Sequence, residues 1–369
     1  MTTPPKGGLI LVTGVTGYVR SIDPPIASSE KYFPELTKII QIASWTALKL
    51  LEQGYKVRGT ARTLSKAEYL KTGPFAKYAS NFEIAEVADL EDDGAFNEAV
   101  KGVDGIAHIA SPFHYRVADA YVDLINPAVN GTVNLLKAAK EFAGPHLKRV
   151  VITSSFAAIV EPQEPGHTFD ETQWNQHSVN LAEAFKADPT NPSKQIPANE
   201  AYRASKALAE RSLWDFVKTE KPSFEVAAIN PVFVFGPVIH SVKDAESINT
   251  SVFLLYKYIA GLNPKVEEGA APKAFVDVRD VADAHVRALE VEEAKGQRFL
   301  NVGGPFTWGE VVEVLRKHNK LTKNDYPPTG EVVPTYGYNT TKSKEVLGLK
   351  YTSLEDSVLA TADSVEAFL

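Results

Sequence analysis

Short apolar runs alternate with segments of helical periodicity over the first two thirds of the chain. Seven runs have the length and the Gly, Pro, Asn or Asp boundaries of buried strands: residues 9–13, 55–60, 82–87, 105–110, 150–153, 226–232 and 298–302. The helical segments are residues 44–53, 94–101, 126–142 and 278–290, and a glycine closes each of the first three. Strands that alternate with helices predict parallel βαβ units, and hence an α/β fold with a Rossmann-type doubly wound parallel sheet.

Three proline-containing segments interrupt this alternation: residues 167–199, 237–271 and 305–369. We interpret them as a smaller lobe that shapes a substrate pocket and is interleaved with a Rossmann domain of residues 1–304. The final stretch reads as irregular and polar.

The amino-acid composition excludes several classes of function. The chain has 369 residues, of which 44% are hydrophobic and 23% charged, and its net charge is −7. This is a globular composition without the basic excess of nucleic-acid-binding proteins. The absence of cysteine excludes disulfide scaffolds and thiolate zinc sites, and the eight histidines lack metal-ligand spacing. Without the apolar core of a signal peptide or a bilayer-length apolar run, we expect a cytoplasmic protein with no metal, nucleic acid or membrane as partner.

The loop after the first predicted strand contains a candidate phosphate site. It comprises Thr13, Gly14, Val15, Thr16, Gly17 and Tyr18. A strand that runs through glycines into a helix N-terminus presents backbone N–H groups to a pyrophosphate, and a Cβ there would hold the phosphate away. The alternative is a plain tight turn.

The spacing after this loop indicates an insertion at residues 19–41. Gly17 lies 42 residues before Gly59, whereas a dinucleotide fold needs about 20. Without these 23 residues the spacing becomes 19, the loop reads G-x-x-G-x-x-A with Ala43 last, and a helix starts at Ile42. Because the segment separates the loop from its helix and its end codons can match splice sites, we interpret it as a translated intron. The alternative is a genuine surface loop that leaves binding intact.

Basic residues follow the second predicted strand, where cofactor selection takes place. Arg62 and Lys66 stand there, and no Asp or Glu does. A guanidinium pairs with a ribose 2′-phosphate that a carboxylate would repel, so NADPH is favoured over NADH. The alternative is a solvated basic loop. Asp89 and Leu90, after the third strand, suit the adenine.

Tyr202 and Lys206 stand four residues apart on one face of a predicted helix. A neighbouring ammonium favours the phenolate and lowers the tyrosine pKa toward a range useful for proton transfer.

Tyr338 and Lys342 repeat the spacing by chance in a stretch rich in Gly and Thr. Only the first pair follows a strand that ends in hydroxyl residues, Thr153, Ser154 and Ser155, and a serine there can polarise a substrate carbonyl.

With these motifs the sequence resembles the extended short-chain dehydrogenase/reductase superfamily. Within it, the chain is most similar to fungal NADPH-dependent aldehyde/ketone reductases of the methylglyoxal-reductase and dihydroflavonol-reductase-like group. The matching stretches between Leu9 and about Gly304 include LVTGVTGY, HIASPF, GTVNLLKAA, VVITSS, YRASKALAE, NPVFVFGP and FVDVRDVADAH.

This resemblance implies Ser155, Tyr202 and Lys206 as the catalytic set. It also implies that Arg62 and Lys66 hold the 2′-phosphate. The cofactor-binding set is Thr13, Gly14, Thr16, Gly17, Tyr18, Ile42, Arg62, Lys66, Asp89, Leu90, Ala110, Ser111, Thr153, Tyr202, Lys206, Pro231 and Val234.

The expected reaction is NADPH-dependent reduction of an aldehyde or ketone. A Ser/His/Asp hydrolase is disfavoured because no G-x-S-x-G elbow occurs. Two alternatives keep the fold: a sugar-nucleotide epimerase or dehydratase with tightly held NAD, and a non-catalytic NADP(H)-binding protein if the insertion disables the phosphate loop. The carbonyl substrate and the oligomeric state are left open.

Overall fold

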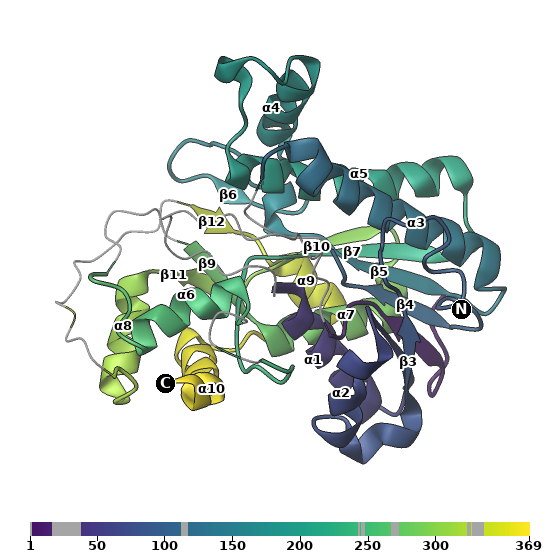
Figure 1. Ribbon diagram of the computed structural model, residues 1–369, viewed down its shortest axis with the longest axis horizontal. Coiled ribbons are helices and arrows are strands. Elements are labelled where there is room, and N and C mark those ends of the chain that lie inside the picture. Colours follow the sequence, from purple (N-terminus) through teal and green to yellow (C-terminus); the bar gives the residue numbers. More distant parts are fainter. Residues whose placement is uncertain are drawn as a thin grey trace.

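The computed structural model describes residues 2–16, 38–111, 117–242, 244, 248–266, 273–322, 326 and 336–369 (Figure 1). None of the helices in these ranges is both long and apolar enough to cross a bilayer.

A seven-stranded parallel sheet forms the centre of the molecule (Figure 1). Its strand order is β10-β7-β5-β4-β1-β2-β3. The strands are β1 (Leu9–Val12), β2 (Lys56–Ala61), β3 (Phe82–Glu86), β4 (Gly105–His108), β5 (Arg149–Thr153), β7 (Glu225–Pro231) and β10 (Gln297–Asn301). The predicted doubly wound α/β sheet is confirmed. The order reverses between β1 and β4, so the ligand crevice of such a fold lies at their carboxyl ends.

Helices cover both faces of this sheet, and alternate residues of one strand contact different helices. Ile10 and Val12 of β1 belong to a core that includes residues of α1 (Lys38–Glu52) and α7 (Val278–Glu290). Leu11 belongs to the opposite core, with residues of α3 (Asn126–Phe142) and α5 (Ala198–Glu220). A strand buried on both faces needs a continuous apolar run, which explains the pattern seen in the sequence.

The predicted bounds of α3 and α7 match the structure, whereas the helix predicted over residues 94–101 is wrong. This stretch is a succession of turns, with Asn97 N–H bonded to the Gly94 carbonyl and Lys101 N–H to the Glu98 carbonyl. Gly94 and Gly102 both have positive φ, 77° and 70°, at its two ends. These two bends bound a stretch of turns, whose apolar side chains still reach the core.

A second group of elements has its own core. It includes the small sheet of β8 (Phe233–Phe235), β9 (Lys273–Asp277) and β11 (Gly304–Phe306), and helices α6 (Thr250–Ile259), α8 (Trp308–Lys317) and α10 (Leu354–Val365). The remaining elements are α2 (Glu68–Thr72), α4 (Gln176–Ala187), α9 (Thr341–Leu347) and the paired strands β6 (Thr168–Phe169) and β12 (Gly337–Tyr338).

The prediction of an irregular C-terminal stretch is therefore wrong. A capping box in which Thr307 and Glu310 bond each other's backbone N–H groups starts α8, and the Ser353 hydroxyl caps α10. Both start signals are present in the sequence, directly before apolar positions with helical spacing.

The buried carboxylate of Asp280 ties the C-terminal part to α7. It accepts hydrogen bonds from the Thr352 backbone N–H at 2.7 Å and the Thr352 hydroxyl at 2.9 Å. Burial, reinforced by the neighbouring charges of Asp277 and Asp283, raises the pKa of Asp280 to about 6, although the Thr352 bonds oppose the shift.

We expect this carboxylate to make stability depend on pH. A carboxyl whose pKa is higher in the folded state stabilises the fold below its unfolded pKa of about 3.9, and this contribution is lost as the pH rises through 6. In urea titrations between pH 4.5 and 7.5, Asp280→Asn should therefore gain stability relative to the parent as pH rises, by on the order of 2–3 kcal/mol. If the free energy of unfolding had the same pH dependence in both proteins, this prediction would be wrong.

Candidate active site

The glycine loop lies at the point where the strand order reverses. Gly14 has a φ of +81°, and a Cβ on it would lie 3.1 Å from the Ala110 Cβ, so the loop approaches the end of β4 as only glycine permits. The Thr13 hydroxyl accepts hydrogen bonds from the N–H groups of Ile109 and Ala110, both at 2.9 Å.

Thr16 Oγ1 is buried and has no hydrogen-bond partner among the described residues. Gly17 and Tyr18 lie outside these residues.

Helix α1 is held against this loop. The Ser44 hydroxyl donates to the Val15 carbonyl at 3.0 Å, and the Gln41 amide donates to the Gly236 carbonyl at 2.7 Å. The helix begins at Lys38, four residues before the predicted start at Ile42, and Ile42 is buried in the core. Residues 38–41 of the predicted insertion thus form the first turn of α1, while residues 19–37 lie outside the described part of the chain.

The structure places the predicted adenosine-binding residues after β2 and β3. Arg62 is half-buried directly after β2, and Lys66 lies in the short helical turn Leu64–Lys66. Asp89 Oδ1 accepts the N–H of Glu91 at 2.9 Å, which fixes a turn, and the Leu90 side chain is buried in the core against α3.

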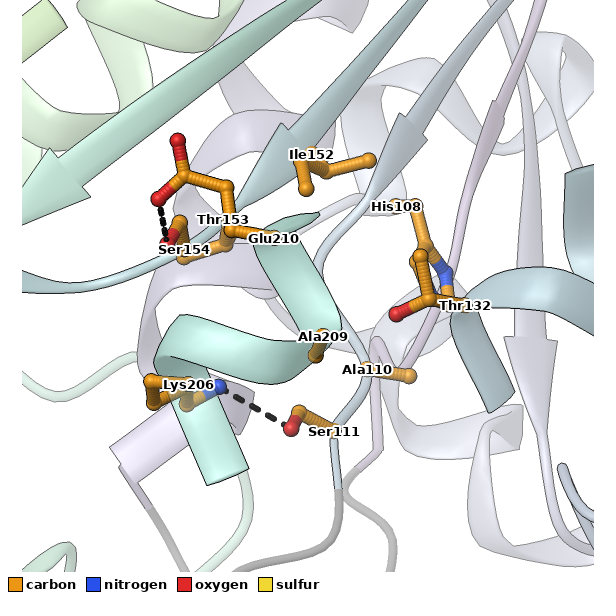
Figure 2. Close-up of a pocket in the computed structure, with 10 residues that line it drawn as sticks. All are labelled: His108, Ala110, Ser111, Thr132, Ile152, Thr153, Ser154, Lys206, Ala209 and Glu210. Carbon is orange, nitrogen blue, oxygen red and sulfur yellow. Dashed lines mark hydrogen bonds between the residues drawn. The ribbon is translucent and has the colours of Figure 1, made fainter. Parts of the chain in front are cut away.

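The three predicted catalytic residues belong to two elements that pack together. Ser155 follows β5 and caps the short helix Phe156–Ala158, its Oγ accepting the Ala157 N–H at 3.1 Å. This short helix packs against α5, which carries Tyr202 and Lys206 on consecutive turns. The Lys206 side chain is 6% exposed, and its Nζ donates to Ser111 Oγ at 2.9 Å, as Figure 2 shows. The ends of β4 and β5 therefore meet one face of α5.

The second pair with this spacing does not share a helix. Tyr338 is part of β12, with its ring centre 5.5 Å from that of Phe156, whereas Lys342 on α9 forms an ion pair with Glu171 at 3.1 Å and donates to Gln297. Of the two pairs, only Tyr202 and Lys206 lie on one helix, as the sequence predicts.

A small cavity of about 10 Å³ lies behind Lys206 (Figure 2). Its lining residues are His108, Ala110, Ser111, Thr132, Ile152, Thr153, Ser154, Lys206, Ala209 and Glu210. It brings together four residues that the sequence analysis assigned to the site: Ala110, Ser111, Thr153 and Lys206. Two others, Pro231 and Val234, are buried at the end of β7 and in β8.

Two buried histidines orient threonines of the site. His285 contacts the Val281 carbonyl through Nδ1 at 2.7 Å, so this nitrogen carries the proton and Nε2 accepts the Thr153 hydroxyl at 2.6 Å. His108 Nδ1 lies 3.0 Å from the Thr13 hydroxyl, which already accepts two N–H groups and donates here. Burial lowers the pKa of His285 to about 4 and the pKa of His108 to about 3, so both rings are neutral. From the sequence we treated the histidines as surface or pocket residues.

A buried ion pair lies behind Ser155, and the sequence analysis missed it. Glu210 on α5 pairs with Arg298 on β10, with Nε–Oε1 at 2.5 Å and Nη2–Oε2 at 3.1 Å. The same carboxylate accepts the Ser154 hydroxyl at 2.5 Å (Figure 2) and the Asn230 amide at 2.8 Å. The Arg298 guanidinium also lies 3.7 Å from the centre of the Trp174 ring. One sequence signal was available: Glu210 stands one turn after Lys206 on the same helix face.

Among the described residues, no group of three His, Asp or Glu side chains could hold a metal ion.

Comparisons with known proteins extend these observations. The sequence model of the NAD dependent epimerase/dehydratase family matches residues 41–303, so the match begins at the last residue of the predicted insertion. A ketoreductase of Aspergillus niger, azaE, is 37% identical over 341 residues, which cover 89% of this chain and 94% of the relative. The NADPH-dependent methylglyoxal reductase GRE2 of Saccharomyces cerevisiae is 33% identical over 86% of this chain and 93% of its own.

A solved structure has the same fold. The crystal structure of Gre2 from Candida albicans in complex with NADPH superposes with a TM-score of 0.76 at 30% identity. The superposition covers 98% of this chain and 99% of the other.

Proposed function

This chain belongs to the NAD dependent epimerase/dehydratase family. From that premise we propose that it reduces an aldehyde or ketone to an alcohol with NADPH. The residues that would carry the reaction are Ser155, Tyr202 and Lys206. The observations that support the proposal are the packing of α5, which carries Tyr202 and Lys206, against the short helix that Ser155 caps, and the bond from Lys206 to Ser111 after β4. The named relatives are reductases, and two of their names or titles include NADPH.

The residues at the strand reversal fit a dinucleotide. Gly14 leaves the backbone open where a Cβ would collide with Ala110, and the Thr16 hydroxyl is a buried polar group without a partner in the described part of the chain. Thr16 would bind the pyrophosphate beside the open backbone at Gly14, and Arg62 and Lys66 would bind the 2′-phosphate. The Thr13 hydroxyl and N–H groups and the Gly14 N–H already have partners within the protein, so these two residues would shape the loop. When bound, NADPH supplies the hydride.

The chain's own residues supply orientation and the proton. The Ser155 hydroxyl would donate a hydrogen bond to the substrate carbonyl oxygen, and the Tyr202 phenol would deliver its proton to the same oxygen. The Lys206 ammonium, one turn along the helix, stabilises the phenolate that remains. Because Ser111 already binds the Lys206 Nζ, the ammonium is held in place before a substrate arrives.

The segments 167–199, 237–271 and 305–369 would shape the carbonyl pocket. The separate core of α6, α8 and α10 supports this assignment for the parts of 237–271 and 305–369 that form these helices. Other parts pack against the central domain, since α4 contacts α5 and Leu347 of α9 belongs to the core of α1 and α7. A panel of aldehydes and ketones, assayed by NADPH oxidation, tests the function, and no turnover with any carbonyl would overturn it. The sugar-nucleotide epimerase alternative is not favoured, because the relatives named above are reductases. A cytoplasmic location stays a prediction.

Cofactor choice is testable at Arg62. Arg62→Ala removes a charge-assisted contact of about 1.5–3 kcal/mol, so NADPH affinity should fall roughly 10- to 100-fold while NADH affinity barely changes. Fluorescence titration with both cofactors measures this. Arg58→Ala is the matched control, because Arg58 is engaged by Glu83 and by the carbonyls of Ala99 and Lys101. Equal losses for both cofactors in Arg62→Ala would make Arg62 a structural residue.

A further inference from the structure

Asn230 on β7 connects the buried ion pair to Ser155. Its side chain is fully buried, and its Nδ2 donates to Glu210 Oε2 at 2.8 Å and to the Ser155 carbonyl oxygen at 3.1 Å. A carboxylate and a carbonyl can only accept, so the amide nitrogen, not its oxygen, must face them.

This orientation leaves a polar atom unsatisfied. Asn230 Oδ1 is buried and has no hydrogen-bond partner in the described part of the chain. Such an acceptor costs about 1–3 kcal/mol, so the amide is poorly explained by its contribution to stability. The two hydrogen bonds that its Nδ2 donates, to Glu210 and to the Ser155 carbonyl, explain the presence of an asparagine better.

Three bonds restrain the backbone at Ser155. The Ser154 hydroxyl binds Glu210, the Ser155 carbonyl accepts from Asn230, and Ser155 Oγ accepts from the Ala157 N–H. Glu210 lies on α5, one turn beyond Lys206, and Arg298 balances its charge. Through Asn230, the Ser155 carbonyl is therefore linked to the helix that carries Tyr202 and Lys206.

We propose that Asn230 is a positioning residue, which holds the Ser155 carbonyl and thereby sets the Ser155 hydroxyl against the proton-donating face of α5. This inference rests on the proposed role of Ser155. Misplacement of a reacting group by about 1 Å can cost on the order of 100-fold in rate, so the effect falls on turnover, not on binding.

The test is a double-mutant cycle with Asn230→Leu and Ser155→Ala. Leucine has the same branching and the same number of side-chain heavy atoms without an unsatisfied oxygen, so the melting temperature should change by only a few degrees. We expect kcat to fall about 10- to 100-fold, with NADPH Kd and carbonyl KM within about threefold. Since Asn230 acts through Ser155, adding Asn230→Leu to Ser155→Ala should lower kcat no further. A multiplicative loss in the double variant would overturn the proposal.

Trp214→Phe is the matched control. It removes another donor to the Glu210 carboxylate, at 3.4 Å, but leaves the bond between Asn230 and Ser155, so kcat should stay within about twofold. An equal loss in this variant would assign the effect to the whole network and overturn the role of Asn230. Asn230→Ala serves if leucine prevents folding, and loss of folding in both would also overturn the proposal, because it requires a small contribution to stability.

The two levels of inference fail in different ways. A fully active Ser155→Ala variant would contradict the proposed function whatever Asn230 does. If kcat falls in Ser155→Ala but is unchanged in Asn230→Leu, only the positioning role of Asn230 is overturned.

Discussion

Tyr202→Phe is expected to lower kcat for carbonyl reduction by about 10²- to 10⁴-fold while NADPH affinity stays nearly the same. The substitution removes only the phenolic O–H, which we propose as the proton donor, and the typical contribution of general acid catalysis has this size. Stopped-flow or steady-state NADPH oxidation measures the rate, and fluorescence titration measures the affinity. The chain without residues 19–41 is the better background, because it separates proton transfer from any effect of that segment.

The chain offers a matched control in Tyr338→Phe. Tyr338 has a lysine four residues later, as Tyr202 does, but Lys342 is engaged by Glu171 and Gln297. Its kcat should equal that of the parent. Undiminished turnover in Tyr202→Phe would remove Tyr202 from the mechanism, and equal losses in both variants would point to a general effect on folding.

Deletion of residues 19–41, joining Tyr18 to Ile42, is expected to raise NADPH affinity tenfold or more. The physical reason is that a phosphate loop binds through N–H groups at a helix N-terminus that follows it directly. The deletion removes Gln41 and its bond to Gly236, but it keeps the bonds from Ser44 to the Val15 carbonyl and from Trp45 to the Pro237 carbonyl, so both forms should fold around the same core.

Parallel titrations of the 369-residue and 346-residue chains measure the effect. Thermal melts of both serve as the folding control. Equal affinities would show that the segment is a tolerated surface loop. Its origin is a separate question, and a messenger that always keeps the 69 corresponding nucleotides would contradict the intron hypothesis.

The sheet could be predicted because its strands are buried on both faces and read as continuous apolar runs. Local signals also gave α3 and α7. Residues 94–101 show the limit of such signals, because their apolar spacing fits a helix while the glycines at both ends impose turns. The C-terminal helices, by contrast, could have been predicted, because the start signals at Thr307 and Ser353 directly precede apolar positions with helical spacing.

The same distinction holds for the site. Tyr202 and Lys206 are four residues apart, and Ser155 ends a strand, so local spacing identifies all three candidates. Asn230 and Arg298 became visible only through the register that places Ile229 beside Thr153 and Asn230 beside Leu300. Pairing between distant strands is set by the tertiary fold, so one sequence could not reveal which of its buried polar residues meet.

The separate core around α6, α8 and α10 has a practical consequence for protein engineering. In the described part of the chain, this core shares no residue with the clusters on either face of the central sheet. Changes at bulky core positions such as Phe253 or Trp308 can therefore be accommodated within the lobe without repacking α5. Directed evolution toward new ketones should begin in this lobe, which we propose shapes the carbonyl pocket, and the proposed proton donor on α5 can stay constant from one generation to the next.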